Sequence, residues 1–369
     1  MASETADTIV IGAGVIGLAI ARELAQTGRE VLVLESNNSF GMETSSRNSG
    51  VVHAGIYYQP GSLKARCCMD GKQMLYDYCR DRQLPFNRCG KLIIASSKDQ
   101  IDQLKALQHN ARCSGLDDIE WLERDQVFEL EPDVRASAGL YSPSTGIIDV
   151  HELMLAFVAD LEAAGGLLVT HSRVLGINVD SGGFKLRVES GGEYAFNATT
   201  VINAAGHEAA NIARRIKGLS ASHIPVIHPV RGHYYEHAGK LPFTRLVYPL
   251  PGKTSLGVHL TIDLAGQARF GPDAEYCETI DYRFDESRKP RFVEAIRDWY
   301  PGLDESRLQP GYVGIRPNLR GPGDDPADFI ISGPGEHGVK GLVNLFGIDS
   351  PGLTSCMALA QEVALKTRG

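Results

Sequence analysis

The chain has 369 residues, which is too long for one ordinary hydrophobic core and therefore predicts two domains. Hydrophobic residues make up 43% and charged residues 22%, the balance of a folded globular protein, and a net charge of −8 offers no basic surface for nucleic acid. No apolar run is long enough for a transmembrane segment. The first apolar stretch carries patterned glycine and no preceding Lys or Arg, so we interpret it as part of the fold and not as a signal peptide.

Seven cysteines are scattered along the chain, and no two of them have C-x-x-C spacing. This pattern argues against zinc and against dithiol chemistry, so we expect no metal site. Unpaired thiols suit a reducing compartment, and we therefore expect a cytoplasmic protein.

Residues 8–35 have the pattern of a strand, a glycine-rich turn, a helix and a second strand. The β-branched run TIVI leads into Gly12-x-Gly14-x-x-Gly17, a helix-forming stretch follows, and the strand VLVL ends on Glu35. Gly12 permits a tight turn, Gly14 allows a pyrophosphate to approach the backbone, and Gly17 allows close helix–sheet packing. The helix N-terminus attracts phosphate, and Glu35 can accept hydrogen bonds from a ribose. The segment predicts a dinucleotide site.

A long polar loop follows Glu35 where an NAD dehydrogenase would continue through further strands and helices. Its sequence, SNNSFGMETSSRNSGVVHAGIYYQPGSLKA, is rich in Ser and Gly but also holds apolar residues and two tyrosines. Such a loop beside a nucleotide site can wrap a long ligand with backbone donors, which favours FAD over NAD.

The part of this loop from Thr44 resembles the flavin-proximal loop of L-2-hydroxyglutarate dehydrogenases and oxidases, within the D-amino-acid oxidase and glycine oxidase superfamily. The segments NRCGKLIIAS, TGIID, VINAAG, PVRGHYY, VYPLPG and LGVHLTID are similar to the same family, so the resemblance covers most of the chain. Where that family usually has His before NSG, this chain has Arg47, as in glycerol 3-phosphate dehydrogenases. The resemblance implies an FAD-dependent oxidoreductase that oxidises a small L-2-hydroxy acid, with L-2-hydroxyglutarate as the expected substrate and 2-oxoglutarate as the product.

Motif and resemblance together imply a set of cofactor-binding residues. In the resembled family, the backbone at Val174 meets the adenine. We also expect the C-terminal helix to point its N-terminus at the flavin and to stabilise negative charge on the reduced ring, the alternative being an ordinary terminal helix. The expected FAD contacts are Gly12, Gly14, Val15, Ile16, Gly17, Glu35, Ser36, Ser45, Ser46, Arg47, Asn48, Ser49, Gly50, Val51, Val174, Ala204, Ala205, Gly206, Gly314, Arg316, Ser350, Pro351, Gly352, Leu353 and Thr354.

The expected fold is α/β, with a Rossmann-like FAD-binding domain and a second domain built on a mainly antiparallel sheet. We assign residues 1–85, 146–220 and 312–369 to the discontinuous FAD-binding domain, and 86–145 and 221–311 to the substrate-binding domain. Expected strands include RVLGINV from Arg173, KLIIAS from Lys91 and SLGVHLTID, and residues 101–114 are expected to form a helix.

Oxidation of a 2-hydroxy acid requires a group that holds the carboxylate and a base that accepts the hydroxyl proton. Arg316 is the first candidate for the carboxylate, because its planar fork gives two parallel charge-assisted bonds and Pro317 is expected to end the preceding strand. Arg231 is a second candidate, for a distal carboxylate.

Histidine is the residue type suited to the base, and the sequence has 11 of them. His53 in the flavin-proximal loop and His259 in the expected strand LGVHLTI are equal candidates. Tyr58 and Tyr248 are weaker candidates, for hydrogen bonds to the substrate, because aromatic packing is the better explanation of each.

Two other functions remain open on the sequence alone. The same scaffold supports an amino-acid or secondary-amine oxidase, and a flavin-binding subunit could relay electrons without a substrate of its own. No motif distinguishes among oxygen, a quinone and a protein as the terminal electron acceptor.

Overall fold

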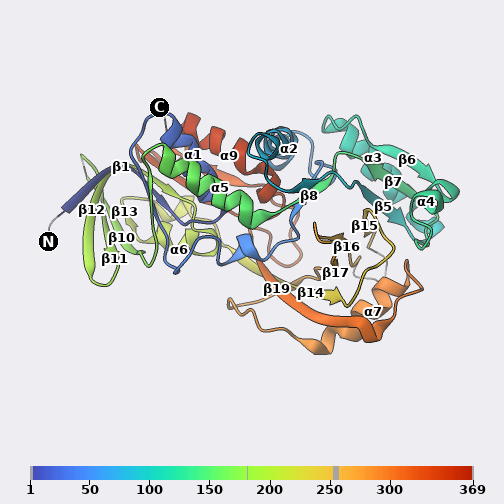
Figure 1. Ribbon diagram of the computed structural model, residues 1–369. Coiled ribbons are helices and arrows are strands. Elements are labelled where there is room, and N and C mark those ends of the chain that lie inside the picture. The colour runs from blue at the N-terminus through green and yellow to red at the C-terminus, as the bar shows by residue number, and fades with distance from the viewer. Residues whose placement is uncertain (1–2, 181, 252–256, 368–369) are drawn as a thin grey trace. The chain divides into compact units, whose positions relative to one another are not determined.

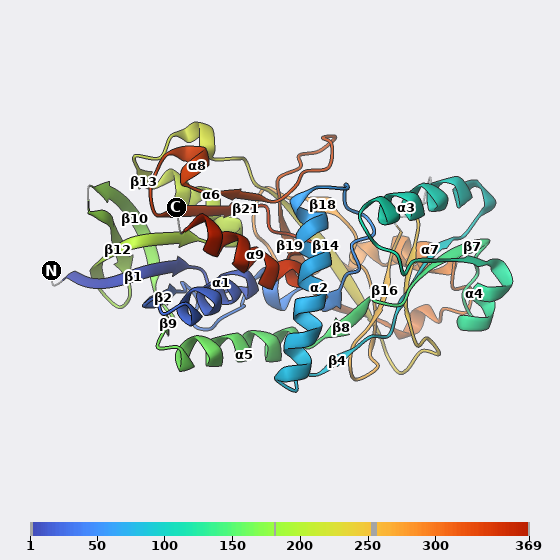
Figure 2. The same ribbon diagram turned by 90° about the horizontal axis from the view of Figure 1, so that it is seen from above.

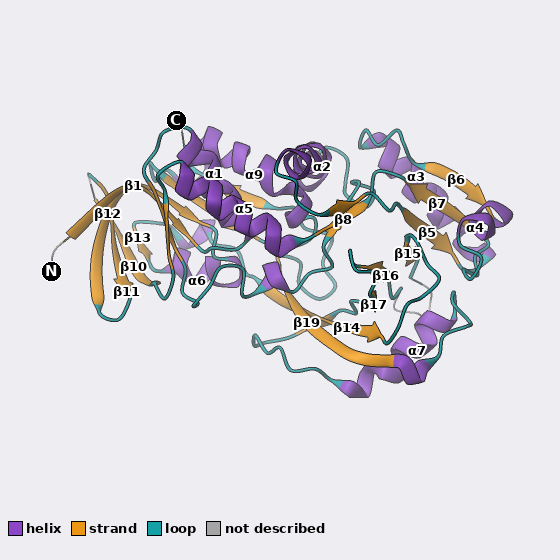
Figure 3. Cartoon of the chain, viewed as in Figure 1, coloured by secondary structure: helices purple, strands orange, loops and turns teal. Residues whose placement is uncertain are grey.

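We describe residues 3–180, 182–251 and 257–367 of a computed structural model. Contacts between residues divide the chain into two compact units. The first unit comprises Met1–Ser46, Val150–Pro229 and Arg316–Gly369, and the second comprises Arg47–Asp149 and Val230–Ile315. Both units mix helices and strands, as expected for the α/β class (Figure 3).

A parallel sheet forms the centre of the first unit. Its strands are β1 (Ser3–Ile11), β2 (Val31–Leu34), β9 (Leu167–Val169), β12 (Glu193–Asn203) and β21 (Leu342–Phe346). β1 pairs in parallel with β2 and β12, β2 with β9, and β12 with β21. The strand residues are mostly apolar and buried on both faces, as a sheet covered on both sides requires.

Further strands extend this sheet on its edges. β10 (Arg173–Asp180) and β11 (Gly183–Glu189) pair antiparallel with each other, and β11 pairs antiparallel with β12. β13 (Ile216–Lys217) pairs with β10, and β20 (Ile330–Ser332) pairs with β21. β10 and β11 thus form an antiparallel hairpin, and residue 181, between them in the sequence, lies outside the described residues.

Three helices pack along the first unit's sheet: α1 (Val15–Gln26), α5 (Val150–Ala163) and α9 (Gly352–Lys366). α1 contacts both α5 and α9, and the three lie side by side in two views (Figures 1 and 2). Leu18, Ile20 and Leu24 of α1 are fully buried or nearly so, which explains why this apolar, Ala-rich segment is stable as a helix. The shorter helices α6 (Ala209–Arg214) and α8 (Pro334–His337) complete this unit.

The second unit is built on a mainly antiparallel sheet with the strand order β18-β14-β17-β16-β15-β5-β7-β6, and β19 pairs with β14. Only the pairing of β15 with β5 is parallel among the pairings described for this sheet. The strands are β5 (Lys91–Ala95), β6 (Glu120–Glu123), β7 (Ala138–Ser142), β14 (His228–His237), β15 (Leu246–Pro249), β16 (Leu260–Ile262), β17 (Ala268–Phe270), β18 (Glu275–Tyr276) and β19 (Leu308–Asn318).

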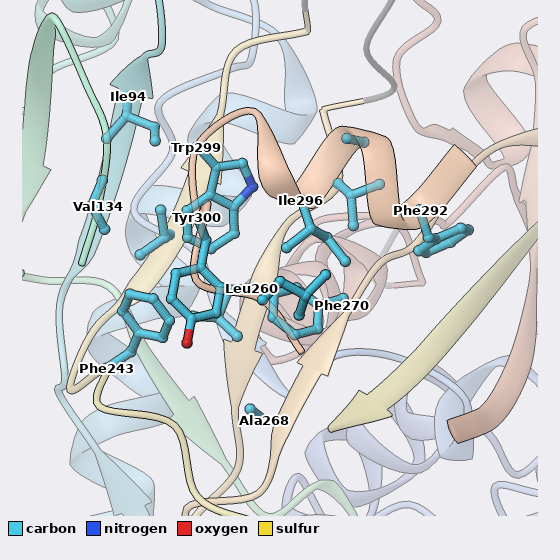
Figure 4. Packing of buried hydrophobic residues seen from close by; sticks show 14 of the residues in the cluster. Ile94, Val134, Phe243, Leu260, Ala268, Phe270, Phe292, Ile296, Trp299 and Tyr300 are labelled. Carbon is cyan, nitrogen blue, oxygen red and sulfur yellow. The ribbon is translucent and has the colours of Figure 1, made fainter. Parts of the chain in front are cut away.

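One face of this sheet packs against α7 (Lys289–Arg297) and the residues that follow it (Figure 4). Phe292 and Ile296 of the helix meet Leu260 and Phe270 of the strands, and Trp299 is fully buried beside them. Each such apolar side chain contributes about 1.5–3 kcal/mol through burial.

The other face of the sheet carries a second apolar cluster, which includes residues of the loop 51–56 and of α3 (Ile101–Cys113). The remaining elements of this unit are α2 (Leu63–Asp81), α4 (Arg124–Leu130) and a small sheet of β3 (Val51–Val52), β8 (Gly146–Ile148) and β4 (Phe86–Asn87). Within β5, Leu92 and Ile94 belong to the cluster under α7, and Ile93 and Ala95 belong to this second cluster. The two-residue period of a strand produces this alternation.

Several expected elements are confirmed, namely VLVL, RVLGINV and KLIIAS as strands and residues 101–113 as a helix. Two details were wrong. Pro317 does not end its strand, because β19 continues to Asn318, and β19 pairs only with β14 among the described strands, so a missing N–H is tolerated. His259 is not in a strand, because β16 begins at Leu260, and part of the expected strand, residues 255–256, lies outside the described residues.

The contact grouping also differs from the predicted boundaries over residues 47–85, which the sequence analysis placed in the FAD-binding domain and the contacts place in the second unit. The reason is that the loop after Ser46 pairs with β8 and packs on the second unit's sheet. In the described part of the chain, no helix is both long and apolar enough to cross a membrane.

Candidate functional site

The turn between β1 and α1 is shaped by its glycines. Gly12 has φ +101°, and a Cβ there would lie 2.8 Å from the carbonyl oxygen of Ala204. A Cβ on Gly17 would lie 1.9 Å from the carbonyl oxygen of Gly12, so no side chain fits at that position. The motif therefore brings the end of β1 against the end of β12 and the first turn of α1 against the strand.

The N-terminus of α1 is open to an anion. Its first turn holds no acidic residue, and Gly14 provides no side-chain cap. Ser45, from the 3-10 helix Thr44–Ser46, accepts a hydrogen bond of 3.0 Å from the backbone N of Val15. A hydroxyl at this point can turn its own proton toward a phosphate while it accepts from the helix.

Glu35 is buried at the end of β2, as the sequence predicts for the ribose-binding acid. Its carboxylate accepts hydrogen bonds from the backbone N of Ala13 at 2.8 Å and from both the backbone and the side-chain amide of Asn37 at 2.8 and 2.9 Å. Ser36 lies beside it, with its hydroxyl 3.4 Å from the same carboxylate. These bonds fix the carboxylate next to the glycine turn, and Asn37 is a supporting residue that the sequence analysis missed.

The ends of β12 and β21 are joined beside this turn. Asn203 is fully buried and donates to the side-chain oxygen of Asn344 at 2.9 Å and to the carbonyl of Ala209 at 2.8 Å. Asn203 is thus a cap that ties two strand ends to α6. The backbone then runs through Ala204 and Ala205 to Gly206, which has φ +54°.

The N-terminus of α9 lies close to that of α1. A Cβ on Gly352 would lie 3.8 Å from Cδ1 of Ile16, and α9, like α1, has no acidic residue in its first turn and no side-chain cap. Thr354 and Ser355 are fully buried in this turn, and the hydroxyl of Ser355 has no hydrogen-bond partner within the described part of the chain. Of the predicted segment Ser350–Thr354, the residues from Gly352 form the first turn of α9, and their contact with the flavin stays a prediction.

These features of the first unit fit the binding of FAD. Two helix N-termini, a turn that only glycine can form, a fixed carboxylate and an orphaned buried hydroxyl gather at the carboxyl ends of parallel strands, where such sheets bind their ligands. Val174 is buried at the second position of β10, and Ser46 lies on the surface with its hydroxyl donating to the carbonyl of Glu43. Their predicted contacts with FAD stay predictions.

The rest of the flavin-proximal loop is held by hydrogen bonds and a ring contact within the second unit. Tyr312 donates a 2.7 Å hydrogen bond to the carbonyl of Asn48, and the hydroxyls of Ser49 and Tyr234 are 3.0 Å apart. The guanidinium of Arg47 lies 4.2 Å from the ring centre of Tyr282.

Two glycines of the predicted set, one in β19 and one in the loop, shape the backbone here. Gly314 allows close packing, since a Cβ there would lie 2.3 Å from the carbonyl oxygen of Arg47. Gly50, with φ +65°, leads into β3, where Val51 pairs with Ile147.

The two candidate arginines differ in their surroundings. Arg316 lies in β19, in the first unit, and its carboxylate-binding role stays a prediction. Arg231, in β14 of the second unit, lies 3.9 Å from Glu275 and 4.0 Å from Asp281. These two carboxylates offset part of the charge of Arg231, although each lies closer to another arginine, Glu275 to Arg288 at 2.6 Å and Asp281 to Arg283 at 2.7 Å. A substrate carboxylate therefore has less to gain there than at an arginine without acidic neighbours.

The candidate histidines lie on one face of the second unit's sheet. Val247 pairs with Leu260, so the next positions, Tyr248 and His259, are opposite each other, and their rings stack at 3.7 Å between centroids. For Tyr58, the described contact is made by its backbone carbonyl, which accepts a 2.9 Å hydrogen bond from the side-chain amide of Asn110. This contact does not place the Tyr58 ring in the candidate site.

The pKa of His53 is influenced by residues on this face. Burial is the main reason that the pKa of His53 lies well below its usual 6.5, and the nearby Lys91 and His259 lower it further. A histidine with this pKa is neutral at physiological pH and can accept a proton.

Lys91 completes the group, and the sequence analysis gave it no role. Its side chain is fully buried, with Nζ 4.6 Å from the ring centre of Tyr248 and 5.1 Å from that of Tyr57. We call His53, Lys91 and His259, with Tyr57 and Tyr248, the basic cluster. Only a lysine at the first position of the otherwise apolar strand KLIIA could have pointed to it in the sequence.

A sheet of parallel strands with a glycine turn, an acidic strand end and a second, mainly antiparallel domain defines a class of dinucleotide-dependent oxidoreductases. The chain belongs to the FAD dependent oxidoreductase family (DAO), whose model matches residues 7–365. FAD is accordingly its cofactor, and the predicted fold class and superfamily are confirmed.

Curated relatives extend over nearly the whole chain. The mitochondrial L-2-hydroxyglutarate dehydrogenase of Arabidopsis thaliana is 42% identical, across 99% of this chain and 84% of that protein. The L-2-hydroxyglutarate dehydrogenase of Escherichia coli K12 is 32% identical, across 98% of this chain and 93% of that protein. Among solved structures, the FAD-bound L-alpha-glycerophosphate oxidase of Mycoplasma pneumoniae has a TM-score of 0.88 at 26% identity, covering 99% of this chain and 95% of that one.

Proposed function

We propose that this chain oxidises L-2-hydroxyglutarate to 2-oxoglutarate. The observation that carries the proposal is the 42% identity over 99% of the chain with a relative named for this activity. The relative of Escherichia coli, with the same activity in its name, supports it at 32% identity. The substrate has two carboxylates, and the basic cluster, which holds no acidic residue, suits a substrate of this charge.

The reaction removes a hydride from C2 and a proton from the attached hydroxyl, and the C–O single bond becomes a carbonyl. When FAD is bound, its flavin ring accepts the hydride. The protein must orient the substrate carbon and take up the proton.

Each of these tasks has a candidate residue. His53 or His259 accepts the hydroxyl proton, since the pKa of His53 leaves its imidazole neutral at pH 7. Arg316 binds the carboxylate next to the reacting carbon through two parallel hydrogen bonds. The glycine turn, Glu35 and the first turn of α9 hold the cofactor.

We also propose that the protein works in the cytoplasm. Among the described residues, no disulfide joins any of the seven cysteines, which is compatible with a reducing compartment. Cell fractionation with an antibody against the chain tests this, and recovery in a mitochondrial fraction, as the name of the Arabidopsis relative states for that protein, would overturn it.

Anaerobic mixing of the FAD-loaded protein with L-2-hydroxyglutarate tests the reaction. We expect the visible flavin absorption to bleach and 2-oxoglutarate to appear in an amount equal to the flavin reduced. D-2-hydroxyglutarate and L-glutamate are the controls, and both should leave the flavin oxidised. Bleaching by an amino acid and not by the hydroxy acid would overturn the proposal in favour of an amine oxidase.

A further inference from the structure

We infer that Lys91 binds the distal carboxylate of the substrate and thereby selects a dicarboxylic 2-hydroxy acid over a monocarboxylic one. The inference rests on the proposed function for the identity of the dicarboxylate. Its starting point is a lysine whose side chain is completely buried in the second unit and whose Nζ has no hydrogen-bond acceptor among the described residues.

The fold explains why this lysine is buried. Lys91 opens β5, where it pairs in parallel with Leu246 and antiparallel with Ser142. Alternation along β5 puts Lys91 on the same side as Ile93, the side that carries Tyr248 and the loop residues 51–56. The strand thus aims the lysine into the layer that holds the two candidate bases, not toward solvent.

The surroundings of the ammonium lack any compensating negative charge. No described carboxylate hydrogen-bonds to it or forms an ion pair with it, and the nearest titratable groups are basic or neutral. His53 lies near enough to Lys91 and His259 for both to lower its pKa, and the Tyr57 and Tyr248 rings flank Nζ of Lys91. Cys68 is also near, but burial raises the pKa of its thiol to about 12, so it stays protonated.

A buried ammonium with three unused donors destabilises a folded chain unless a ligand satisfies it. The two aromatic rings offset only part of the lost hydration, because they attract the charge but accept no conventional hydrogen bonds. Burial accordingly lowers the pKa of Lys91 to about 7. A carboxylate supplies what is missing, since it offers both an opposite charge and several acceptor lone pairs.

Pairing each polar group of the substrate with a candidate residue leaves the distal carboxylate for Lys91. In the proposed function, Arg316 takes the carboxylate beside the reacting carbon, and a histidine takes the hydroxyl proton. The distal carboxylate is then the one charged group of the substrate without a partner. Lys91 fits it better than Arg231, whose guanidinium already has two carboxylates within 4.0 Å.

Tyr57 marks the side from which a ligand can reach Nζ. Tyr248 is 4% exposed and fixed in the sheet, whereas Tyr57 is 41% exposed and belongs to a loop. Rotation of the Tyr57 ring therefore opens the ammonium to a carboxylate without any change in the strands.

The first test compares two substrates in the FAD-loaded enzyme, L-2-hydroxyglutarate and L-2-hydroxypentanoate, in which a methyl group replaces the distal carboxylate. We expect Lys91→Met to raise KM for the dicarboxylate about 30-fold, the loss of a charge-assisted bond, while kcat/KM for the monocarboxylate changes less than about threefold. Lys91→Arg should restore part of the preference. An unchanged ratio of kcat/KM between the two substrates in Lys91→Met would overturn the inference.

Lys72→Met is the matched control, because Lys72 is also buried in the second unit but donates a 3.0 Å hydrogen bond to Ser144. It should leave the substrate preference unchanged, and an equal loss of preference in this variant would count against a specific role of Lys91. If Lys91→Met does not fold, Lys91→Gln, which keeps a polar side chain, takes its place. FAD content and melting temperature identify a folding defect in either variant.

A binding experiment separates this inference from the proposed function. Glutarate is an unreactive dicarboxylate of the same length, and its affinity for the oxidised holoenzyme can be measured by calorimetry. If L-2-hydroxyglutarate fails to bleach the wild-type flavin but glutarate binds in a Lys91-dependent manner, the proposed substrate is wrong and the carboxylate site stands. If the wild type oxidises L-2-hydroxyglutarate and Lys91→Met binds glutarate as tightly as the wild type, the Lys91 site is wrong and the function stands.

Discussion

The glycine turn of the first unit and the basic cluster of the second unit are built in opposite ways. The turn comes from one continuous segment, residues 8–35, and acts mainly through its backbone, its missing Cβ atoms and one carboxylate. The basic cluster comes from three separate segments and acts through long side chains, one of which is fully buried. A site made of backbone requires a local sequence pattern, whereas a site made of side chains requires only that the fold bring them together.

The largest effect is expected where the backbone site is broken. Gly17→Ala places a Cβ 1.9 Å from the Gly12 carbonyl oxygen, which the turn can relieve only by moving away from β1. Overpacking of this kind costs about 1–3 kcal/mol or more, and we expect the protein to be purified without FAD. The ratio of flavin to protein absorbance measures this.

Gly335→Ala is the control for that substitution, since a Cβ there meets nothing within 4 Å. It should leave the FAD content unchanged. Full FAD occupancy in Gly17→Ala would show that the turn tolerates a side chain and would refute the description of this site as one made by its backbone.

Replacing the base should produce the next largest effect. His53→Asn and His259→Asn separate the two candidates, and we expect one of them to slow flavin reduction by about 100-fold to 10,000-fold, the usual contribution of a general base. Stopped-flow absorbance under anaerobic conditions measures the rate. His109→Asn, on the exposed side of α3, serves as the control. Near wild-type rates in the double variant of His53 and His259 would show that the proton acceptor is not a histidine of the basic cluster.

Substitution of the two candidate arginines, Arg316 in the first unit and Arg231 in the second, tests which of them binds the substrate carboxylate. Arg316→Met should raise KM by about 100-fold, because a bidentate bond to a carboxylate contributes about 3 kcal/mol. Arg231→Met should change KM less than about threefold, because the carboxylates of Glu275 and Asp281 already offset part of the charge of Arg231. Steady-state kinetics with L-2-hydroxyglutarate decides between them, and a larger effect at Arg231 would reverse the assignment.

The smallest predicted effect is a pH dependence that separates the two substrates. The pKa of Lys91 is lowered to about 7 by burial, so its ammonium form predominates below that pH and is lost above it. Because the distal carboxylate needs the ammonium, kcat/KM for L-2-hydroxyglutarate should fall by up to about tenfold per pH unit above pH 7. The profile for L-2-hydroxypentanoate should lack this component. Identical profiles above pH 7 would mean that Lys91 does not titrate in the substrate-binding step.

Much of the first unit was predictable because its evidence is local. The run TIVI, the spacing of Gly12, Gly14 and Gly17, and Glu35 at the end of the second strand suffice to predict a strand–helix–strand dinucleotide site. The strand KLIIA and the helix at residues 101–113 followed from periodicity in the same way. The end of β19 was misjudged because the effect of Pro317 depends on whether its strand has a second neighbour, which is a tertiary property.

The sequence by itself determined the dinucleotide site, because a phosphate-binding turn needs particular residues at fixed spacings along one segment. The loop after Glu35 and the resemblance over most of the chain determined the cofactor and the family. The tertiary structure alone decided the environment of each charged side chain. Arg231 faces two carboxylates and Lys91 faces none, although nothing in their neighbouring residues distinguishes them in this way. The physical reason is that the energy of a buried charge depends on groups brought near it from distant parts of the chain, and their positions are fixed only when the sheet is formed.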